Sequence, residues 1–120
     1  MIIRPKDLPE TLQEPRPLAL KRVVNIDEHT DQISVTWARL WGHHDRVVNR
    51  ISDRVYYIIE GSARFQVGDN TPVEDVTAGD FVFIAKDVPY EFEGEMLYVV
   101  MNGPAYRTAS DIVLPRTFSA

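Results

Sequence analysis

The chain has 120 residues, of which 44% are hydrophobic and 26% are charged, and its formal net charge is −5. This length suits one domain with a stable core, so we expect residues 1–120 to form a single domain. The negative charge argues against nucleic acid as a partner, and the lack of cysteine excludes disulfides, zinc ribbons and thiol nucleophiles. Because no apolar run suits a signal peptide or reaches the ~20 residues of a membrane span, we expect a cytoplasmic protein without a membrane partner.

The first strands are predicted after an N-terminal arm. Residues 1–17 contain four prolines, which remove backbone donors, so this segment is expected to be an extended arm. Residues 18–26 predict a strand and residues 27–32 a polar turn. Residues 33–41 alternate strictly, with Trp37 and Trp41 on one face and Ser34 and Thr36 on the other. A slip of one residue would expose both tryptophans, so we expect their face to be buried.

The rest of the chain reads as short strands punctuated by glycine, proline, aspartate and asparagine. Strands are predicted over 54–60, 63–67, 73–76, 81–85, 90–92 and 95–102, with turns between them and an irregular tail over 104–120. The aromatic residues Tyr56, Tyr57, Phe81 and Phe83 are expected to be strand and core residues. No window has a helical period of ten or more residues, which indicates an all-β sandwich or barrel.

Two spacings between glycines organise this pattern. Gly42 is followed by five residues, then Val48-Asn49-Arg50, three residues, Arg54, six residues and Gly61. The second unit begins at Gly79, with Ala85, Asp87, Tyr90 and Gly94 at its spaced positions.

These spacings resemble the two motifs of the cupin superfamily, of the small RmlC-like kind, over residues 30–103. The first cupin motif runs glycine, five residues, His-x-His, three or four residues, Glu, six residues, glycine. The second runs glycine, five residues, Pro-x-Gly, two residues, His, three residues, Asn. The resemblance implies a double-stranded β-helix or jelly-roll barrel, and its support comes from the framework residues Gly42, Gly61, Gly79, Asp80 and Pro89.

The four positions that hold metal ligands in cupins are Val48, Arg50, Arg54 and Tyr90 here. An arginine has no lone pair to donate and stays cationic, so it would repel a metal cation. We therefore expect no metal and no other cofactor at this place.

The same four positions predict a bound small molecule in place of a metal ion. If the resemblance holds, Arg50, Arg54, Tyr56 and Tyr90 share the barrel interior, where unpaired cations are costly and need a negative partner. A carboxylate or phosphate would satisfy the two guanidinium groups, and Trp37 or Trp41 could offer a flat face to a sugar or ring. The predicted ligand-binding residues are Val48, Arg50, Arg54, Tyr56, Tyr90 and Trp37. The open alternative is that the arginines reach solvent or pair with acids such as Glu91, Glu93 or Glu95.

Catalysis is a second open reading. Metal-free cupin enzymes include sugar epimerases and isomerases with a His base and a Tyr acid, and Tyr90 is the best candidate acid here. His43 and His44 are the only candidate bases, and as neighbours in a strand they would face opposite sides. Both are expected in a solvated turn at the barrel rim, at a distance from the substrate that disfavours catalysis.

The favoured prediction is a metal-free, non-catalytic protein that binds a small anionic or carbohydrate-like molecule inside the barrel. The alternatives are a metal-independent sugar isomerase, epimerase or lyase, and a non-catalytic dimerisation or interaction module. The resemblance and the proline-rich arm further predict a homodimer.

Overall fold

The computed structural model describes residues 1–118, which form an antiparallel β architecture with one short helix. The elements are the 3-10 helix η1 (Pro5–Asp7) and the strands β1 (Thr11–Leu12), β2 (Leu18–Val24), β3 (Ser34–Asn49), β4 (Asp53–Val67), β5 (Glu74–Thr77), β6 (Phe81–Ile84), β7 (Tyr90–Gly103) and β8 (Asp111–Val113). None of the helices in residues 1–118 has the length and apolar character that crossing a membrane requires.

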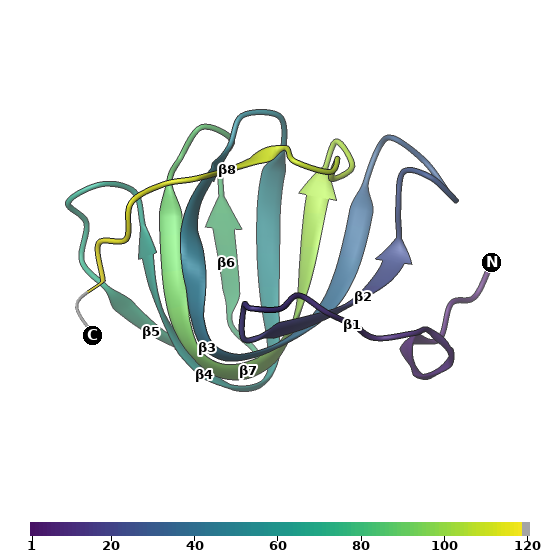
Figure 1. Cartoon of the computed structure of the whole chain (residues 1–120), viewed down its shortest axis with the longest axis horizontal. Helices are drawn as coiled ribbons and strands as arrows, with labels where there is room; N and C mark the ends of the chain where they lie inside the picture. Colours follow the sequence, from purple (N-terminus) through teal and green to yellow (C-terminus); the bar gives the residue numbers. More distant parts are fainter. Residues whose placement is uncertain (119–120) are drawn as a thin grey trace.

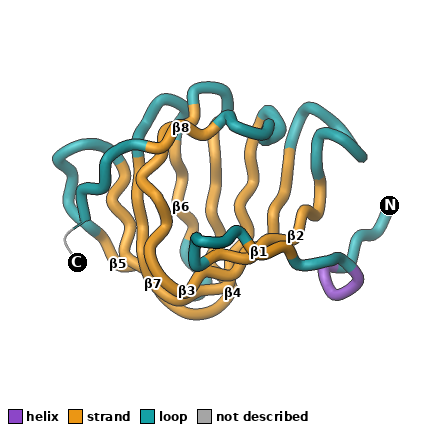
Figure 2. The backbone as a smooth tube through the Cα atoms, viewed as in Figure 1, coloured by secondary structure: helices purple, strands orange, loops and turns teal. Residues whose placement is uncertain are grey.

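The strands curl into a barrel (Figures 1 and 2). Their order is β1-β2-β3-β7-β4-β5, with β6 paired to β4 and β8 paired to β3, and every pairing is antiparallel. The C-terminal segment that carries β8 crosses in front of the long strands (Figure 1). The segment predicted as an irregular tail therefore contributes a strand that covers the barrel.

Three long strands replace several of the predicted short ones. β3 runs through the turn predicted after Gly42, and β4 runs through the turn predicted at Gly61. A register shift between Ile58 and Glu60 accommodates Gly61, whose φ of +84° suits glycine. A Cβ at Gly61 would stand 2.1 Å from the carbonyl oxygen of Glu95, so glycine permits the close approach of β4 and β7. Sequence alone read this glycine as a turn because bulges and turns use the same residue.

The buried face of β3 is the opposite of the predicted one. Ser34, Ala38 and Leu40 are buried, whereas Trp41 on the other face is 41% exposed and stacks against the Arg39 guanidinium. The prediction that the tryptophan face is buried was wrong, because Ser34, Ala38 and Leu40 on the other face of β3 point into the barrel. The core consists of Leu18, Ala38, Leu40, Val47, Tyr56, Ile58, Ala63, Phe65, Ile84, Tyr90, Phe92, Met96 and Tyr98.

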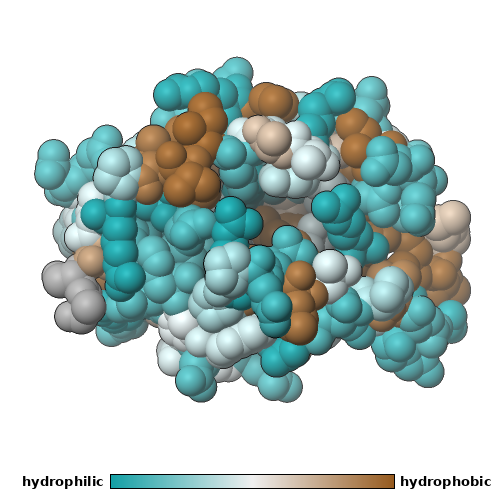
Figure 3. Space-filling view, in the orientation of Figure 1, coloured by the Kyte–Doolittle hydropathy of each residue, from teal (hydrophilic) through white to brown (hydrophobic). Residues whose placement is uncertain are grey.

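Hydrophobic side chains also reach the surface. Phe81 and Phe83 lie on β6 as predicted but are 67% and 62% exposed, so the prediction that they belong to the core was wrong. Tyr57 packs on Phe81 at 4.6 Å between ring centroids, on the outer side of β4. On the face drawn in Figure 3, the hydrophobic surface is divided into several patches separated by polar side chains.

Candidate functional site

A cavity of about 400 Å³ opens into the barrel between β2, β3, β4 and β7 and the segment before β8. Its apolar wall comes from alternate, inward-facing positions such as Leu18 and Leu20 on β2. Polar side chains from several strands also line it, in a larger proportion than small-molecule pockets usually have. The polar lining residues are Gln13, Arg16, Arg22, Thr36, His44, Asp45, Arg54, Tyr56, Tyr98, Asn102, Tyr106, Thr108 and Asp111.

Arg54 is the charged centre of the cavity. Strand alternation turns Arg54, Tyr56 and Ile58 inward, and only 4% of Arg54 is exposed. Its Nη2 donates to Asp111 Oδ1 at 3.0 Å, and its Nε donates to Asn102 Oδ1 at 2.8 Å. Because Asp111 lies on β8, the C-terminal segment supplies the counter-charge for this buried cation.

Two tyrosine hydroxyls continue the polar chain. Arg54 Nη1 donates to the Tyr90 hydroxyl, which lies 2.6 Å from the Tyr56 hydroxyl. Burial raises the pKa of Tyr90, although the charge of Arg54 opposes the rise, and burial also raises the pKa of Tyr56 well above its ordinary value. Both phenols therefore stay protonated at neutral pH. Tyr56 lines the cavity, whereas Tyr90 lies behind it, between Tyr56 and Arg54.

His44 faces the same cavity from β3. Its ring stacks on Phe92 at 4.3 Å between centroids and lies 6.3 Å from the Tyr90 ring. Its Nδ1–H donates to the carbonyl oxygen of Asp45 at 2.8 Å, which leaves Nε2 as the basic nitrogen. Burial lowers the pKa of His44 to about 4, so the ring is neutral at physiological pH. Nε2 is neither buried nor hydrogen-bonded within residues 1–118, and it therefore meets the cavity. We call His44, Arg54, Tyr56, Tyr90 and Asp111 the inner cluster.

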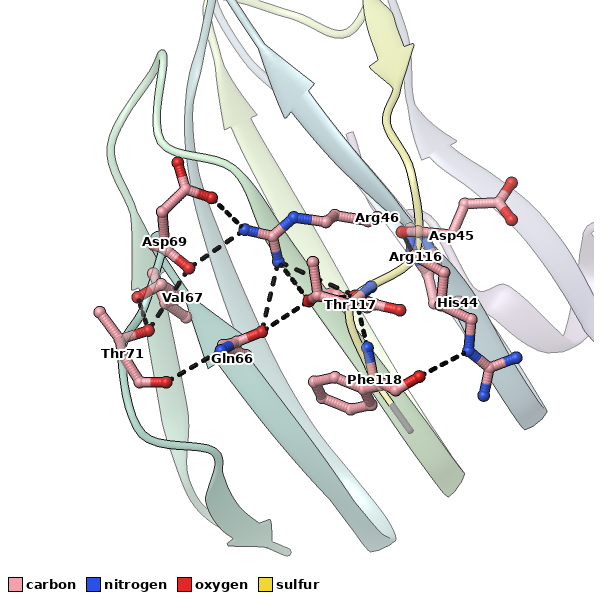
Figure 4. A network of polar contacts seen from close by, with 12 residues as sticks. His44, Asp45, Arg46, Gln66, Val67, Asp69, Thr71, Arg116, Thr117 and Phe118 are labelled. Atoms are coloured by element: carbon pink, nitrogen blue, oxygen red, sulfur yellow. Dashed lines mark hydrogen bonds and ion pairs between the residues drawn. The ribbon is translucent and has the colours of Figure 1, made fainter. Parts of the chain in front are cut away.

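A second polar group, the outer cluster, lies on the opposite face of the same strands and consists of His43, Arg46, Gln66, Asp69, Glu91 and Thr117. Glu91 is fully buried, and its carboxylate accepts from His43 Nε2 and from the Thr117 backbone N–H at 3.0 Å. Arg46 Nη2 donates to Asp69 Oδ1 at 2.6 Å (Figure 4). This cluster fixes the C-terminal segment against the sheet.

Burial by itself would raise the pKa of Glu91. The hydrogen bonds from Thr117 and His43 outweigh that effect and lower the pKa below its ordinary value. Glu91 is thus a buried anion satisfied by its neighbours.

The predicted site residues divide between the cavity and other places. Arg54 and Tyr56 line the cavity, and Tyr90 lies directly behind Tyr56. Val48 is buried beside Ile112 of β8 but is not among the lining residues, and Trp37 lies on the opposite face of β3 from Thr36, which does line the cavity.

A β-bulge explains why Val48 misses the cavity. His44 pairs with Phe92 and Val47 pairs with Tyr90, so β3 carries one extra residue between these pairs. The bulge reverses the alternation, and Val47 rather than Val48 faces the cavity. The spacing of the cupin motif predicted Val48 as the inward-facing residue, one position after the residue that faces the cavity.

Arg50 does not enter the barrel. It lies in the turn after β3, its side chain is 62% exposed, and its Nη1 is 3.4 Å from Asp87 Oδ1. The expectation that Arg50 shares the interior with Arg54 was wrong. The alternative that an arginine reaches solvent describes Arg50, whereas Arg54 pairs with Asp111 rather than with the acids considered at first.

The side chains at the four cupin ligand positions do not fit a metal ion. Arg54 is a cation with no lone pair, and the Tyr90 hydroxyl is already bonded to Arg54 and Tyr56. Residues 1–118 contain no group of three or more His, Cys, Asp or Glu side chains that could hold a metal ion. We therefore derive no chemistry through a metal.

Several cavity residues were missed or misjudged from the sequence. His44 was expected in a solvated turn but lies within β3, although the expectation that His43 and His44 face opposite sides is confirmed. Asp111 was assigned to an irregular tail. A buried Arg54 needs a negatively charged partner, and this need was the signal that pointed to an acid such as Asp111. Many acids in the chain could have met it, so the signal did not single out Asp111.

Solved structures with the same architecture include Streptomyces Pac13, described as a unique nucleoside dehydratase. The two chains are 16% identical with a TM-score of 0.79, over 95% of this chain and 90% of Pac13. Pac13 variants with one histidine replaced by Gln, or one of two tyrosines replaced by Phe, have been solved with uridine.

Oxalate decarboxylase from Bacillus subtilis also matches, at 16% identity and a TM-score of 0.79, over 95% of this chain and 33% of the decarboxylase. The chain therefore spans about a third of that enzyme. No family model and no curated protein sequence matches the chain. These likenesses concern the fold alone, and they confirm the predicted all-β, cupin-like jelly-roll barrel.

Proposed function

We propose that the cavity binds a nucleoside or a similar sugar-bearing molecule and that the protein removes water from it without a metal ion. The observation that carries this proposal is the arrangement of the inner cluster. A neutral histidine with a free Nε2 and a phenol backed by a second phenol and an arginine face one cavity of about 400 Å³. A base and an acid that face one pocket are the parts that an elimination needs.

The proposed reaction acts on a sugar carbon next to a carbonyl group. His44 Nε2 accepts the proton from that carbon, and the electron pair of the C–H bond forms a C=C bond as the hydroxyl on the next carbon leaves. Tyr56 donates its proton to the leaving hydroxyl, which departs as water. The Tyr56 phenolate then accepts a hydrogen bond from Tyr90, and Arg54 stabilises the charge through Tyr90. Proton exchange with water returns the proton from His44 to Tyr56.

The pKa of about 4 at His44 limits the choice of substrate. Such a histidine is a weak base, so it suits a carbon acid that a neighbouring carbonyl already activates. In this scheme Tyr56 contacts the substrate and Tyr90, the candidate acid in the sequence, positions it from behind.

Pac13 supports the substrate class. The two tyrosines replaced in its variants are 34 residues apart, as are Tyr56 and Tyr90. The histidine replaced there precedes the first of these tyrosines by 13 residues. By counting, that is the position of His43, whereas the histidine that faces the cavity in this chain is His44.

Binding without catalysis is the second candidate function. It is favoured by the pairing of Arg54 with Asp111, which compensates the charge of Arg54 without a ligand. The same pairing weakens the case for an anion bound directly by Arg54, and it supports a neutral, hydroxyl-rich molecule at this end of the cavity.

The experiment combines binding with turnover. Thermal shift with uridine, cytidine, adenosine, guanosine and ribose should reveal a ligand, because a ligand at 100 times its Kd adds ~2.7 kcal/mol of stability. Carbonyl-bearing derivatives of the hit are then followed for loss of water, with Tyr56→Phe as the test variant. Turnover lost in Tyr56→Phe supports the dehydratase; binding without turnover supports the second candidate; no binding contradicts both.

The remaining proposals concern the whole molecule. We propose a single domain over residues 1–120, an RmlC-like member of the cupin-type barrels, that acts in the cytoplasm as a homodimer. The exposed Phe81 and Phe83 on β6 and the N-terminal segment with β1 support a contact between two copies. Light scattering on Phe81→Ser/Phe83→Ser protein tests the dimer, which should dissociate; an unchanged mass would contradict this interface.

A further inference from the structure

The charges around the cavity do not balance. Three arginines line it together with two aspartates. Arg54 pairs with Asp111 at 3.0 Å, and Arg16 pairs with Asp45 at 2.9 Å. Within residues 1–118, the side chain of Arg22 makes no ion pair and no hydrogen bond. Among the described residues, Arg22 is therefore the one cation of this cavity without an ion-pair partner.

Arg22 faces inward because of its place on β2. Leu18, Leu20 and Arg22 alternate along the strand, and all three line the cavity. Arg22 is the outermost of them and is exposed, so its guanidinium lies at the mouth and not in the core.

One row of directly paired residues joins Arg22 to the inner cluster. Arg22 pairs with Thr36, Thr36 with Val100, and Val100 with Tyr56. Three strand spacings correspond to about 14 Å between the first and last Cα along the curved sheet. A ligand that contacts both Tyr56 and Arg22 therefore reaches across the cavity from β4 to β2.

A second cavity of about 220 Å³ continues from the mouth. Four residues line both cavities, namely Arg22, Thr36, Tyr106 and Thr108. They combine one guanidinium with three hydroxyl donors, which suits the several acceptor oxygens of a phosphate group. Arg107 and Asp27 also line the second cavity, so the two cavities together still have one arginine more than they have aspartates.

We propose that the ligand carries a phosphate monoester, which Arg22 binds at the junction of the two cavities with help from the hydroxyls of Thr36, Tyr106 and Thr108. The substrate class is then a phosphorylated nucleoside or sugar, with its sugar at the inner cluster and its phosphate at the mouth. This inference rests on the proposed function, since it assumes that the cavity binds a sugar-bearing molecule.

The test compares matched pairs by calorimetry: uridine with uridine 5′-monophosphate, adenosine with adenosine 5′-monophosphate, and ribose with ribose 5-phosphate. Inorganic phosphate alone is the further probe. We expect the phosphorylated member of a binding pair to bind about tenfold or more tightly, because hydrogen bonds to charged groups are the stronger ones. That advantage should shrink at high salt, since Arg22 is exposed.

Arg22→Gln should reduce the affinity ratio toward one. Arg50→Gln is the matched control, because Arg50 is also exposed but lies in the turn after β3, and it should keep the ratio. Comparable melting temperatures of both variants and the wild type verify that folding is intact.

The outcomes separate the two proposals. Nucleosides or ribose that bind without a phosphate advantage, or an advantage that survives in Arg22→Gln, would overturn the phosphate site and leave the proposed function standing. Failure of every pair to bind would overturn both.

Discussion

The inner and outer clusters occupy opposite faces of the same stretch of β3 and β7. They are built from adjacent residues: His43 and His44 on one strand, Tyr90 and Glu91 on the other. Each contains a histidine, an acid and a buried arginine. Strand alternation alone sends one member of each pair inward and the other outward.

The two clusters differ in what completes their hydrogen bonds. In the outer cluster the Glu91 carboxylate is fully buried and is satisfied by His43 and by the C-terminal segment. In the inner cluster His44 Nε2 and the Tyr56 hydroxyl meet a cavity. The same residue types therefore seal the barrel on one face and offer a base and an acid on the other.

The largest expected effect separates the two histidines. His44→Gln should reduce turnover of a dehydration substrate by about 10²–10⁴-fold, because it removes the proposed general base. His43→Gln is the matched control, and its turnover should stay within a few fold of wild type, since His43 faces the outer cluster. Steady-state kinetics on both variants decides this. The reverse ranking would mean that His43 and not His44 is the base.

The next effect concerns the two arginines of the first motif. Arg54→Met should lower the free energy of unfolding by about 3–5 kcal/mol, because it leaves Asp111 without its buried partner. Arg50→Met should change it by less than about 0.5 kcal/mol, since Arg50 is exposed. Urea unfolding measures both. Equal losses in the two variants would contradict the distinction between the buried and the surface arginine.

The lowered pKa of His44 predicts how stability should depend on pH. His44 has a folded pKa of about 4 against an ordinary 6.5, so between these values the unfolded chain binds a proton that the folded protein does not. Stability should therefore fall as the pH drops from 6.5 toward 4, by on the order of 3 kcal/mol, and this contribution should stay constant below that range. Urea unfolding at several pH values tests it, with His44→Gln as the reference that lacks this contribution. A slope unchanged in His44→Gln would assign the effect to another group.

The sequence predicted the barrel from the spacing of its glycines, although Gly42 and Gly61 lie within strands and not in turns. The spacing of Gly42, Gly61 and Gly79 and the short apolar runs were enough to predict a cupin-like architecture, which the structure confirms. Arg54 and Tyr56 were predicted correctly as inward residues, because strict alternation holds from Arg54 to Ile58.

The composition of the site depends on features that no local pattern reveals. The bulge between His44 and Val47 reverses the alternation of β3 and keeps Val48 out of the cavity. Asp111 pairs with Arg54 across 57 residues of sequence. Such a contact is decided by how the C-terminal segment crosses the barrel, and alternation within one strand carries no information about it.

The smallest expected effect tests the outer cluster. Glu91→Gln keeps the shape of the side chain but removes the charge that accepts from His43 and Thr117, so it should lower the free energy of unfolding by about 1–3 kcal/mol. Glu95→Gln on the same strand is the exposed control and should change it by less than about 0.5 kcal/mol. Because Glu91 faces away from the cavity, the affinity for an inner-cluster ligand should stay within about twofold of wild type. A large loss of affinity would mean that the C-terminal segment, held by Glu91 on one face, positions Asp111 on the other, and the two clusters would then act as one unit.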